Sequence, residues 1–213
     1  MYEFVFFDLD GTLTDSGPGI TGATQYALRK MGIDVPDRKS LSFCVGPPLV
    51  DIFQEKYGMT AEDADRTLEI YREYYWRKGL FENEVYPGME ALLKRLRDSG
   101  RKLVVATSKP ESMAEVILDH FGLARYFELI AGATTDGTRY RKNEVIRYAI
   151  GRAGIRDMKS VVMVGDRKYD VEGAKTFGMA SVGVTYGYGT REELEKAGAD
   201  FIAESVPEIE RYV

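Results

Sequence analysis

Residues 4–16 of the chain read FVFFDLDGTLTDS, and this stretch decides the fold. Its apolar, aromatic and β-branched first part predicts a buried strand, which ends abruptly on Asp8 and Asp10. Side chains alternate along a strand, so these two carboxylates share one side while Leu9 points to the other. Gly11 then allows the backbone to turn sharply.

The two aspartates predict a cation site. Two carboxylates at the end of a buried strand repel each other and lose solvation, which costs free energy unless a cation or a proton lies between them. A hard divalent cation such as Mg²⁺, which prefers oxygen ligands, is the expected occupant. An isolated pair of this kind more often caps a turn, so the interpretation depends on the rest of the chain.

Length and composition bound the class of protein. The chain has 213 residues, of which 44% are hydrophobic and 30% charged, as in a soluble globular protein of one large domain or one domain with a modest insert. A formal net charge of −5 argues against nucleic acid or an anionic membrane as the main partner.

The cellular compartment is expected to be the cytoplasm. No apolar run approaches the roughly 18 residues of a membrane-spanning helix, and the first residues lack the basic start of a secretory signal. Cys44 is the only cysteine, which excludes an internal disulfide and suits a reducing compartment. We interpret Cys44 and the single histidine, His120, as structural residues.

The order of the predicted elements divides the chain into two parts. Residues 17–80 show helical periodicity without a strand pattern, so residues 16–84 are expected to form an all-helical insert. Residues 1–15 and 85–213 are expected to form an α/β core, in which strands near 102–106, 127–131, 160–164 and 180–184 alternate with helices. This alternation predicts right-handed crossovers and a doubly wound parallel sheet covered on both faces.

Polar residues follow three of the predicted strands. Ligands bind outside the carboxyl ends of the strands in such sheets, so these residues should meet in one crevice if the strands are neighbours. The crevice would gather carboxylates for a metal ion, and hydroxyl and ammonium groups for an anion, which together point to phosphoryl chemistry. The candidates are Asp8, Asp10, Asp166 and Asp170 among the acids, Thr107 and Ser108 among the hydroxyls, and Lys142, with Arg141 as the weaker alternative.

These residues carry a family resemblance over essentially the whole chain. The segments DLDGT at 8–12, TSK at 107–109, Lys142 and GDRKYD at 165–170 resemble, in order and spacing, the four motifs of the haloacid dehalogenase-like superfamily of phosphohydrolases. Within it the chain looks most like phosphoglycolate phosphatase-like enzymes, a group that includes members described as 5′-nucleotidases. The resemblance implies a Rossmann-like core, with residues 16–84 as a mobile helical cap domain.

The resemblance also implies a role for each motif residue. Asp8 would be the nucleophile that forms an aspartyl-phosphate, and Asp10 would donate and accept the protons. Mg²⁺ would be held by Asp8, the backbone carbonyl of Asp10 and Asp166, with Asp170 acting directly or through water. Thr107 and Lys142 would stabilise the transferring phosphoryl group, with Ser108 as a further hydroxyl. The implied partner is a small phosphorylated metabolite.

Three other functions fit parts of the same pattern. A phosphomutase of the β-phosphoglucomutase type would return the phosphoryl group to a sugar. A phospho-acceptor signalling module would carry an aspartyl-phosphate without turnover, which Asp10 argues against. A non-catalytic binding protein would not need the full set of polar groups. Dehalogenation is disfavoured, because that activity in the family lacks the second aspartate and needs no metal.

Three cationic residues lie beside the motifs, and each can be explained by solvent exposure or ion pairing without a catalytic role. Lys109, at a predicted helix start, faces solvent or a substrate, and solvent is favoured. Arg167 and Lys168 flank the acidic motif and are placed to pair with it.

Overall fold

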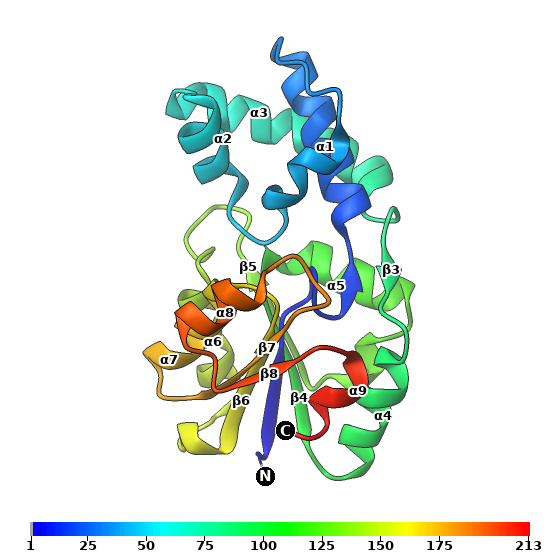
Figure 1. Cartoon of the computed structure of the whole chain (residues 1–213), viewed down its shortest axis with the longest axis vertical. Helices are drawn as coiled ribbons and strands as arrows, with labels where there is room; N and C mark the ends of the chain where they lie inside the picture. The colour runs from blue at the N-terminus through cyan, green and yellow to red at the C-terminus, as the bar shows by residue number, and fades with distance from the viewer. Residues whose placement is uncertain (1) are drawn as a thin grey trace. The chain divides into compact units, whose positions relative to one another are not determined.

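The computed structural model describes residues 2–213. They divide into two compact units (Figure 1). Among the described residues, the α/β unit consists of residues 2–14 and 85–213, and the helical unit of residues 15–84.

A parallel sheet of six strands forms the centre of the α/β unit in the part of the chain that the structure describes. The strands lie in the order β5-β4-β1-β6-β7-β8. Their bounds are β1 Phe4–Phe7, β4 Lys102–Pro110, β5 Leu129–Ala133, β6 Val161–Gly165, β7 Ala180–Val184 and β8 Phe201–Ala203. Successive strands are added outward on both sides of β1, so the predicted doubly wound α/β fold is confirmed.

The register of β1 brings its carboxyl end level with that of β6 and with Val105 in the middle of β4. Phe7 pairs with Val105 of β4 and with Val164 of β6, and the Asp8 N–H donates to the Val164 carbonyl over 2.9 Å. All four residues of β1 are buried, as expected for a parallel strand covered on both faces. The residues that follow these strands therefore emerge at one edge of the sheet.

Helices cover both faces of this sheet, with α6 and α7 on one side and α4 and α9 on the other (Figure 1). Side chains of α6 such as Val145 and Ile146 join a buried core with Phe4 and Phe6 of β1. The helices are α4 Met89–Asp98, α5 Glu111–His120, α6 Lys142–Ala153, α7 Lys168–Thr176, α8 Arg191–Ala197 and α9 Val206–Ile209, with short 3₁₀ turns at Ala124–Tyr126 and Met158–Ser160.

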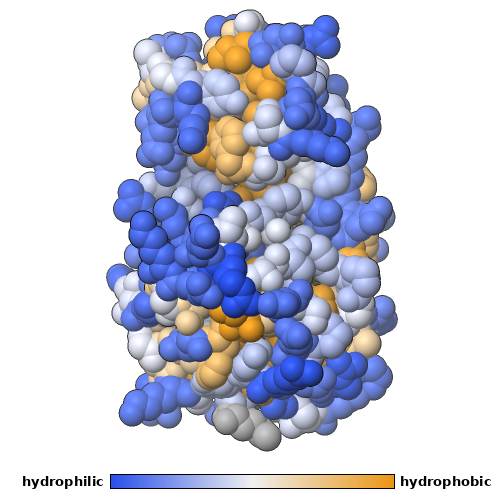
Figure 2. Space-filling view, viewed as in Figure 1, coloured by the Kyte–Doolittle hydropathy of each residue, from blue (hydrophilic) through white to orange (hydrophobic). Residues whose placement is uncertain are grey.

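On the face shown in Figure 2, the α/β unit is mostly hydrophilic, with a small apolar patch over β8. Phe201 of β8 is 37% exposed, and its ring stacks on Tyr212 with 5.0 Å between the centroids. Among the described residues, none of the helices is both long enough and apolar enough to span a membrane.

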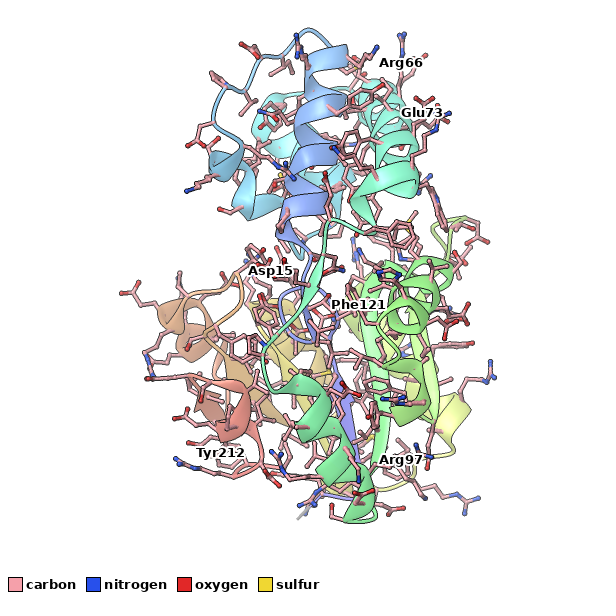
Figure 3. All side chains as sticks on the ribbon, turned by 90° about the vertical axis from the view of Figure 1, so that its right-hand side faces the viewer. Asp15, Arg66, Glu73, Arg97, Phe121 and Tyr212 are labelled. Carbon is pink, nitrogen blue, oxygen red and sulfur yellow. The ribbon has the colours of Figure 1, made fainter. Side chains whose placement is uncertain are left out.

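The helical unit consists of α1 Gly17–Lys30, a 3₁₀ helix at Arg38–Cys44, α2 Leu49–Tyr57, α3 Ala61–Tyr74 and a π-helical turn at Tyr75–Gly79. The rings of Tyr71 and Tyr75 are buried and stack with 5.2 Å between their centroids, so these aromatic residues serve packing. Arg66 and Glu73 project from α3 into solvent (Figure 3).

Strands β2 (Thr14–Asp15) and β3 (Glu84–Val85) were not predicted from the sequence. They pair with each other in a separate two-stranded sheet. Strands of two residues are too short to show the alternation on which strand prediction depends.

Candidate active site

Four aspartates gather at the carboxyl end of the central strands. Asp8 and Asp10 follow β1, Asp166 follows β6, and Asp170 lies in the first turn of α7. Each of them is at most 8% exposed. Oxygens of Asp8, Asp166 and Asp170 lie within 4.8 Å of one another. These acidic residues therefore lie together at one edge of the sheet.

Lys142 lies among the carboxylates. Its Nζ is 2.7 Å from Asp8 Oδ1 and 2.7 Å from Asp170 Oδ1, and it donates to the Ala106 carbonyl over 2.9 Å. The side chain is buried because α6 begins at this residue and packs on β4 and β5. Arg141, the weaker sequence candidate, is exposed. The cation at this position is thus Lys142.

Lys109 also belongs to the cluster, and the expectation that it faces solvent was wrong. The residue is 8% exposed, and its Nζ lies 3.0 Å from Asp10 Oδ2. Strand β4 runs on to Pro110 instead of ending near Ala106, so Lys109 stays on the strand and lies two residues after Thr107. The wrong expectation followed from placing the end of this strand near Ala106.

The hydroxyl groups at the end of β4 differ in burial. Thr107 is 1% exposed, and its Oγ1 accepts a hydrogen bond from the Lys109 N–H over 3.2 Å. Ser108, the other predicted hydroxyl, is only half-buried. Thr107 is therefore the buried hydroxyl at this strand end.

Arg167 pairs outside the acidic cluster. Its Nε lies 2.9 Å from Glu193 Oε1 on α8, and the Lys168 N–H donates to the same oxygen over 2.9 Å. The Arg167 backbone N–H also donates to Asp170 Oδ2 over 3.1 Å, so the residue contacts the acidic motif through its backbone as well.

When all four carboxylates are ionised, the charges in the cluster do not balance. Four buried carboxylates face two buried ammonium groups, those of Lys109 and Lys142. Burial raises the pKa of Asp8 to about 6, with Lys142 opposing the shift and Asp170 adding to it. Burial, followed by the charges of Asp170 and Asp8, raises the pKa of Asp166 well above its usual range. A hard divalent cation would supply the missing charge, and the oxygen donors fit it.

A loop after β7 holds Asp166 in place, and it was not predicted from the sequence. It consists of residues 186–189, YGYG, and we call it the YGYG loop. The Tyr188 N–H donates to Asp166 Oδ2 over 2.7 Å, and the Tyr186 hydroxyl donates to the Thr12 carbonyl over 2.9 Å. Thr12 Oγ1 in turn donates to Asp166 Oδ1 over 3.4 Å. Both oxygens of Asp166 are thereby oriented.

Glycines give this loop its close approach to the carboxylate. A Cβ at Gly187 would lie 2.3 Å from the Gly11 carbonyl oxygen and 2.5 Å from Asp166 Cβ. Gly11 itself has φ +83°, and a Cβ there would lie 2.2 Å from Asp166 Oδ2. Neither position has room for a side chain.

We expect Gly187→Ala to lower the free energy of unfolding by about 2–3 kcal/mol, because the new methyl group would overlap atoms that cannot move away. Gly151→Ala on α6 is the matched control, since a Cβ there meets nothing within 4 Å, and it should leave stability unchanged or slightly raised. Chemical denaturation of both variants measures the difference. Equal stability of the two would contradict the close packing of the YGYG loop.

The sequence of this chain is similar to those of known proteins. A sequence model described as haloacid dehalogenase-like hydrolase matches residues 5–184. A 5′-nucleotidase from Pseudomonas aeruginosa is 43% identical over 193 residues, which are 91% of this chain and 87% of that protein. A phosphoglycolate phosphatase from Neisseria meningitidis is 35% identical over 219 residues, covering 97% of this chain and 92% of that protein.

A protein described as a kinase and a solved structure also match the chain. The tyrosine-protein kinase PtkA from Mycobacterium tuberculosis is 40% identical over 201 residues, covering 94% of this chain and 68% of that protein. Among solved structures, a predicted phosphatase from Clostridium acetobutylicum has a TM-score of 0.97 and 49% identity, covering 100% of this chain and 98% of the other.

Proposed function

The chain belongs to the haloacid dehalogenase-like hydrolases and is a phosphatase, and from this premise we propose that it hydrolyses small phosphate monoesters through an aspartyl-phosphate on Asp8. The family resemblance read from the four motifs is confirmed by these matches. The observation that carries the proposal is the buried cluster of four aspartates and two lysines at the carboxyl end of the sheet. Such a cluster can hold a metal ion and a phosphoryl group side by side.

Asp8 is the proposed nucleophile. One of its oxygens attacks phosphorus while the ester P–O bond breaks, and the alcohol oxygen keeps the bonding electron pair and takes a proton from Asp10. Water then attacks the aspartyl-phosphate, Asp10 takes a proton from that water, and the bond to Asp8 breaks to release phosphate. The short contact between Lys142 and Asp8 supports this role, because it fixes the carboxylate beside a positive charge.

Lys142 and Thr107 are the proposed ligands of the transferring phosphoryl group. Lys142, at the start of α6, is buried against Asp8, and Thr107 is buried in β4. A buried ammonium group stabilises the negative charge on the phosphoryl oxygens more strongly than an exposed one would. Ser108 is half-buried, and its hydroxyl group is proposed as a secondary ligand of the phosphoryl group.

Mg²⁺ is the proposed cofactor. Asp8, the Asp10 carbonyl, Asp166 and Asp170 would hold it, and the excess negative charge of the buried carboxylates supports this assignment. When bound, the ion would neutralise negative charge on the phosphoryl group.

The helical unit, residues 15–84, is the proposed cap domain that selects the substrate. The relatives named 5′-nucleotidase and phosphoglycolate phosphatase suggest a nucleoside monophosphate or a small phosphorylated acid. We also propose a cytoplasmic location, which suits a chain whose single cysteine, Cys44, is buried as a free thiol.

Phosphate release from a panel of monoesters tests the proposal. We expect turnover of at least one nucleoside monophosphate, phosphoglycolate or sugar phosphate with Mg²⁺, and a loss of at least about 100-fold when a chelator removes the metal, because the carboxylate charges are then uncompensated. Activity that survives chelation would contradict the metal requirement. Return of the phosphoryl group to a product sugar, or its transfer from ATP to a protein tyrosine without net hydrolysis, would replace hydrolysis by group transfer.

A further inference from the structure

We infer that Lys109 is a positioning residue, which holds the carboxylate of Asp10 in the orientation that proton transfer requires. The inference rests on the proposed function, in which Asp10 exchanges protons with the leaving group and with water. Lys109 Nζ lies 3.0 Å from Asp10 Oδ2, and the two side chains are 5% and 11% exposed. An ion pair this short and this shielded from water restrains both partners more than a surface pair would.

The two oxygens of Asp10 have different surroundings. Oδ2 contacts the Lys109 ammonium group, whereas Oδ1 is buried and has no hydrogen-bond partner among the described residues. A buried polar atom without a partner destabilises the fold, because it has lost its hydrogen bonds to water and forms none in the protein. Such an atom is therefore unexpected unless it has a function. The arrangement suits a carboxylate that is anchored through one oxygen and exchanges protons through the other.

The backbone at Lys109 is itself held firmly. Its N–H donates to Thr107 Oγ1 over 3.2 Å, and the next residue, Pro110, pairs with Ala133 of β5. Gly132 of β5 permits this approach, since a Cβ there would lie 2.7 Å from the Lys109 carbonyl oxygen. The ammonium group therefore projects from a fixed point of the sheet toward Asp10.

Lys109 and Lys142 have different neighbours. Lys142 contacts Asp8 and Asp170, at the proposed site of attack on phosphorus, whereas Lys109 contacts the proposed proton donor. A lysine that binds the phosphoryl group should matter equally for every ester. A lysine that orients Asp10 should matter most where the leaving group needs a proton.

The test compares two esters that differ in this need. Lys109→Met should lower kcat/KM for an alkyl phosphate by about 100-fold, since a general acid contributes on the order of 10²–10⁴. It should lower kcat/KM for p-nitrophenyl phosphate by less than about fivefold, because p-nitrophenolate leaves without protonation. Lys102→Met, at the partly exposed start of the same strand, is the matched control and should leave both values unchanged.

Equal losses on the two esters would overturn the positioning role and leave the phosphatase intact. A wild-type protein that hydrolyses neither p-nitrophenyl phosphate nor any monoester of the panel would instead overturn the proposed function, and the role of Lys109 with it.

A double variant keeps the test decisive if Lys109→Met leaves Asp10 as an unpaired buried charge and does not fold. Asp10→Asn with Lys109→Met removes both members of the pair and should be no more than about threefold less active on the alkyl ester than Asp10→Asn alone. A further loss of about 100-fold in the double variant would show that Lys109 acts independently of Asp10 and would overturn the inference.

Discussion

Replacing Asp8 by asparagine is expected to lower kcat by about 10⁴-fold or more on every phosphate monoester that the wild-type protein hydrolyses. An amide cannot replace the carboxylate as the oxygen nucleophile, and losing a nucleophile removes the gain from splitting the reaction into two steps. Release of inorganic phosphate under saturating substrate and Mg²⁺ measures the effect. Asp98→Asn, an exposed position at the end of α4, is the control and should retain the wild-type rate.

The same variant also allows a test that does not depend on catalysis, namely the pH dependence of the free energy of unfolding in metal-free protein. Burial raises the pKa of Asp8 from 3.8 to about 6, so the folded protein holds this proton more tightly than the unfolded chain. The stability that follows from this is fully present below about pH 4 and is lost as the pH rises through 6. Asparagine does not titrate. The free energy of unfolding of Asp8→Asn, relative to that of the wild type, should therefore rise by up to about 3 kcal/mol as the pH rises over this interval.

Urea denaturation in chelator at pH 4 and pH 7 measures that gain. If the stability difference between Asp8→Asn and the wild type stays constant with pH, Asp8 is not the shielded carboxylate described above. If the variant instead hydrolyses phosphate monoesters within tenfold of the wild-type rate, Asp8 is not the nucleophile.

Lys142→Met is expected to lower both activity and stability. Activity should fall by about 10³-fold, because the positive charge beside the proposed phosphoryl site is removed. The free energy of unfolding should fall by about 3–5 kcal/mol in metal-free protein, because Asp8 and Asp170 are left buried without the cation that lies 2.7 Å from each. Steady-state kinetics and chemical denaturation measure the two effects.

Two further variants distinguish this account from a general loss of packing. Lys159→Met, in an exposed 3₁₀ turn, should change neither quantity. Adding Asp170→Asn to Lys142→Met removes one of the stranded charges and should recover part of the lost stability but none of the activity. A double variant that is less stable than Lys142→Met alone would contradict charge compensation as the role of Lys142.

The sequence predicted the centre of the site because its signals are local. A buried run of aromatic or β-branched residues that leads to Asp8 or to Asp166 marks the end of a parallel strand, and such ends meet at one edge of the sheet when the strands are neighbours. Lys142 was found by its place at the start of a helix, in a sequence order that resembles a known family. The aspartates needed only the residues next to them and the rule for parallel sheets, whereas Lys142 also needed the order of the motifs along the chain.

The remaining features depend on partners distant in sequence. Tyr186 donates to the carbonyl of Thr12, a residue 174 positions earlier, and nothing in the local pattern of either residue indicates the contact. Arg167 pairs with Glu193 on a later helix, although acids lie much closer in sequence. Lys109 was misjudged for a local reason, because a Lys-Pro pair after a strand resembles a helix start when the strand in fact continues.

The central position of β1 has a consequence for how the chain is made. Phe4–Phe7 lie between β4 and β6, whose residues begin at Lys102 and Val161, so ribosomal synthesis produces this apolar segment long before either flanking strand. During that interval both of its hydrogen-bonding edges are open, which exposes a nascent chain to mispairing and to chaperone capture. Efficient production should therefore depend on the speed of synthesis through Gly165.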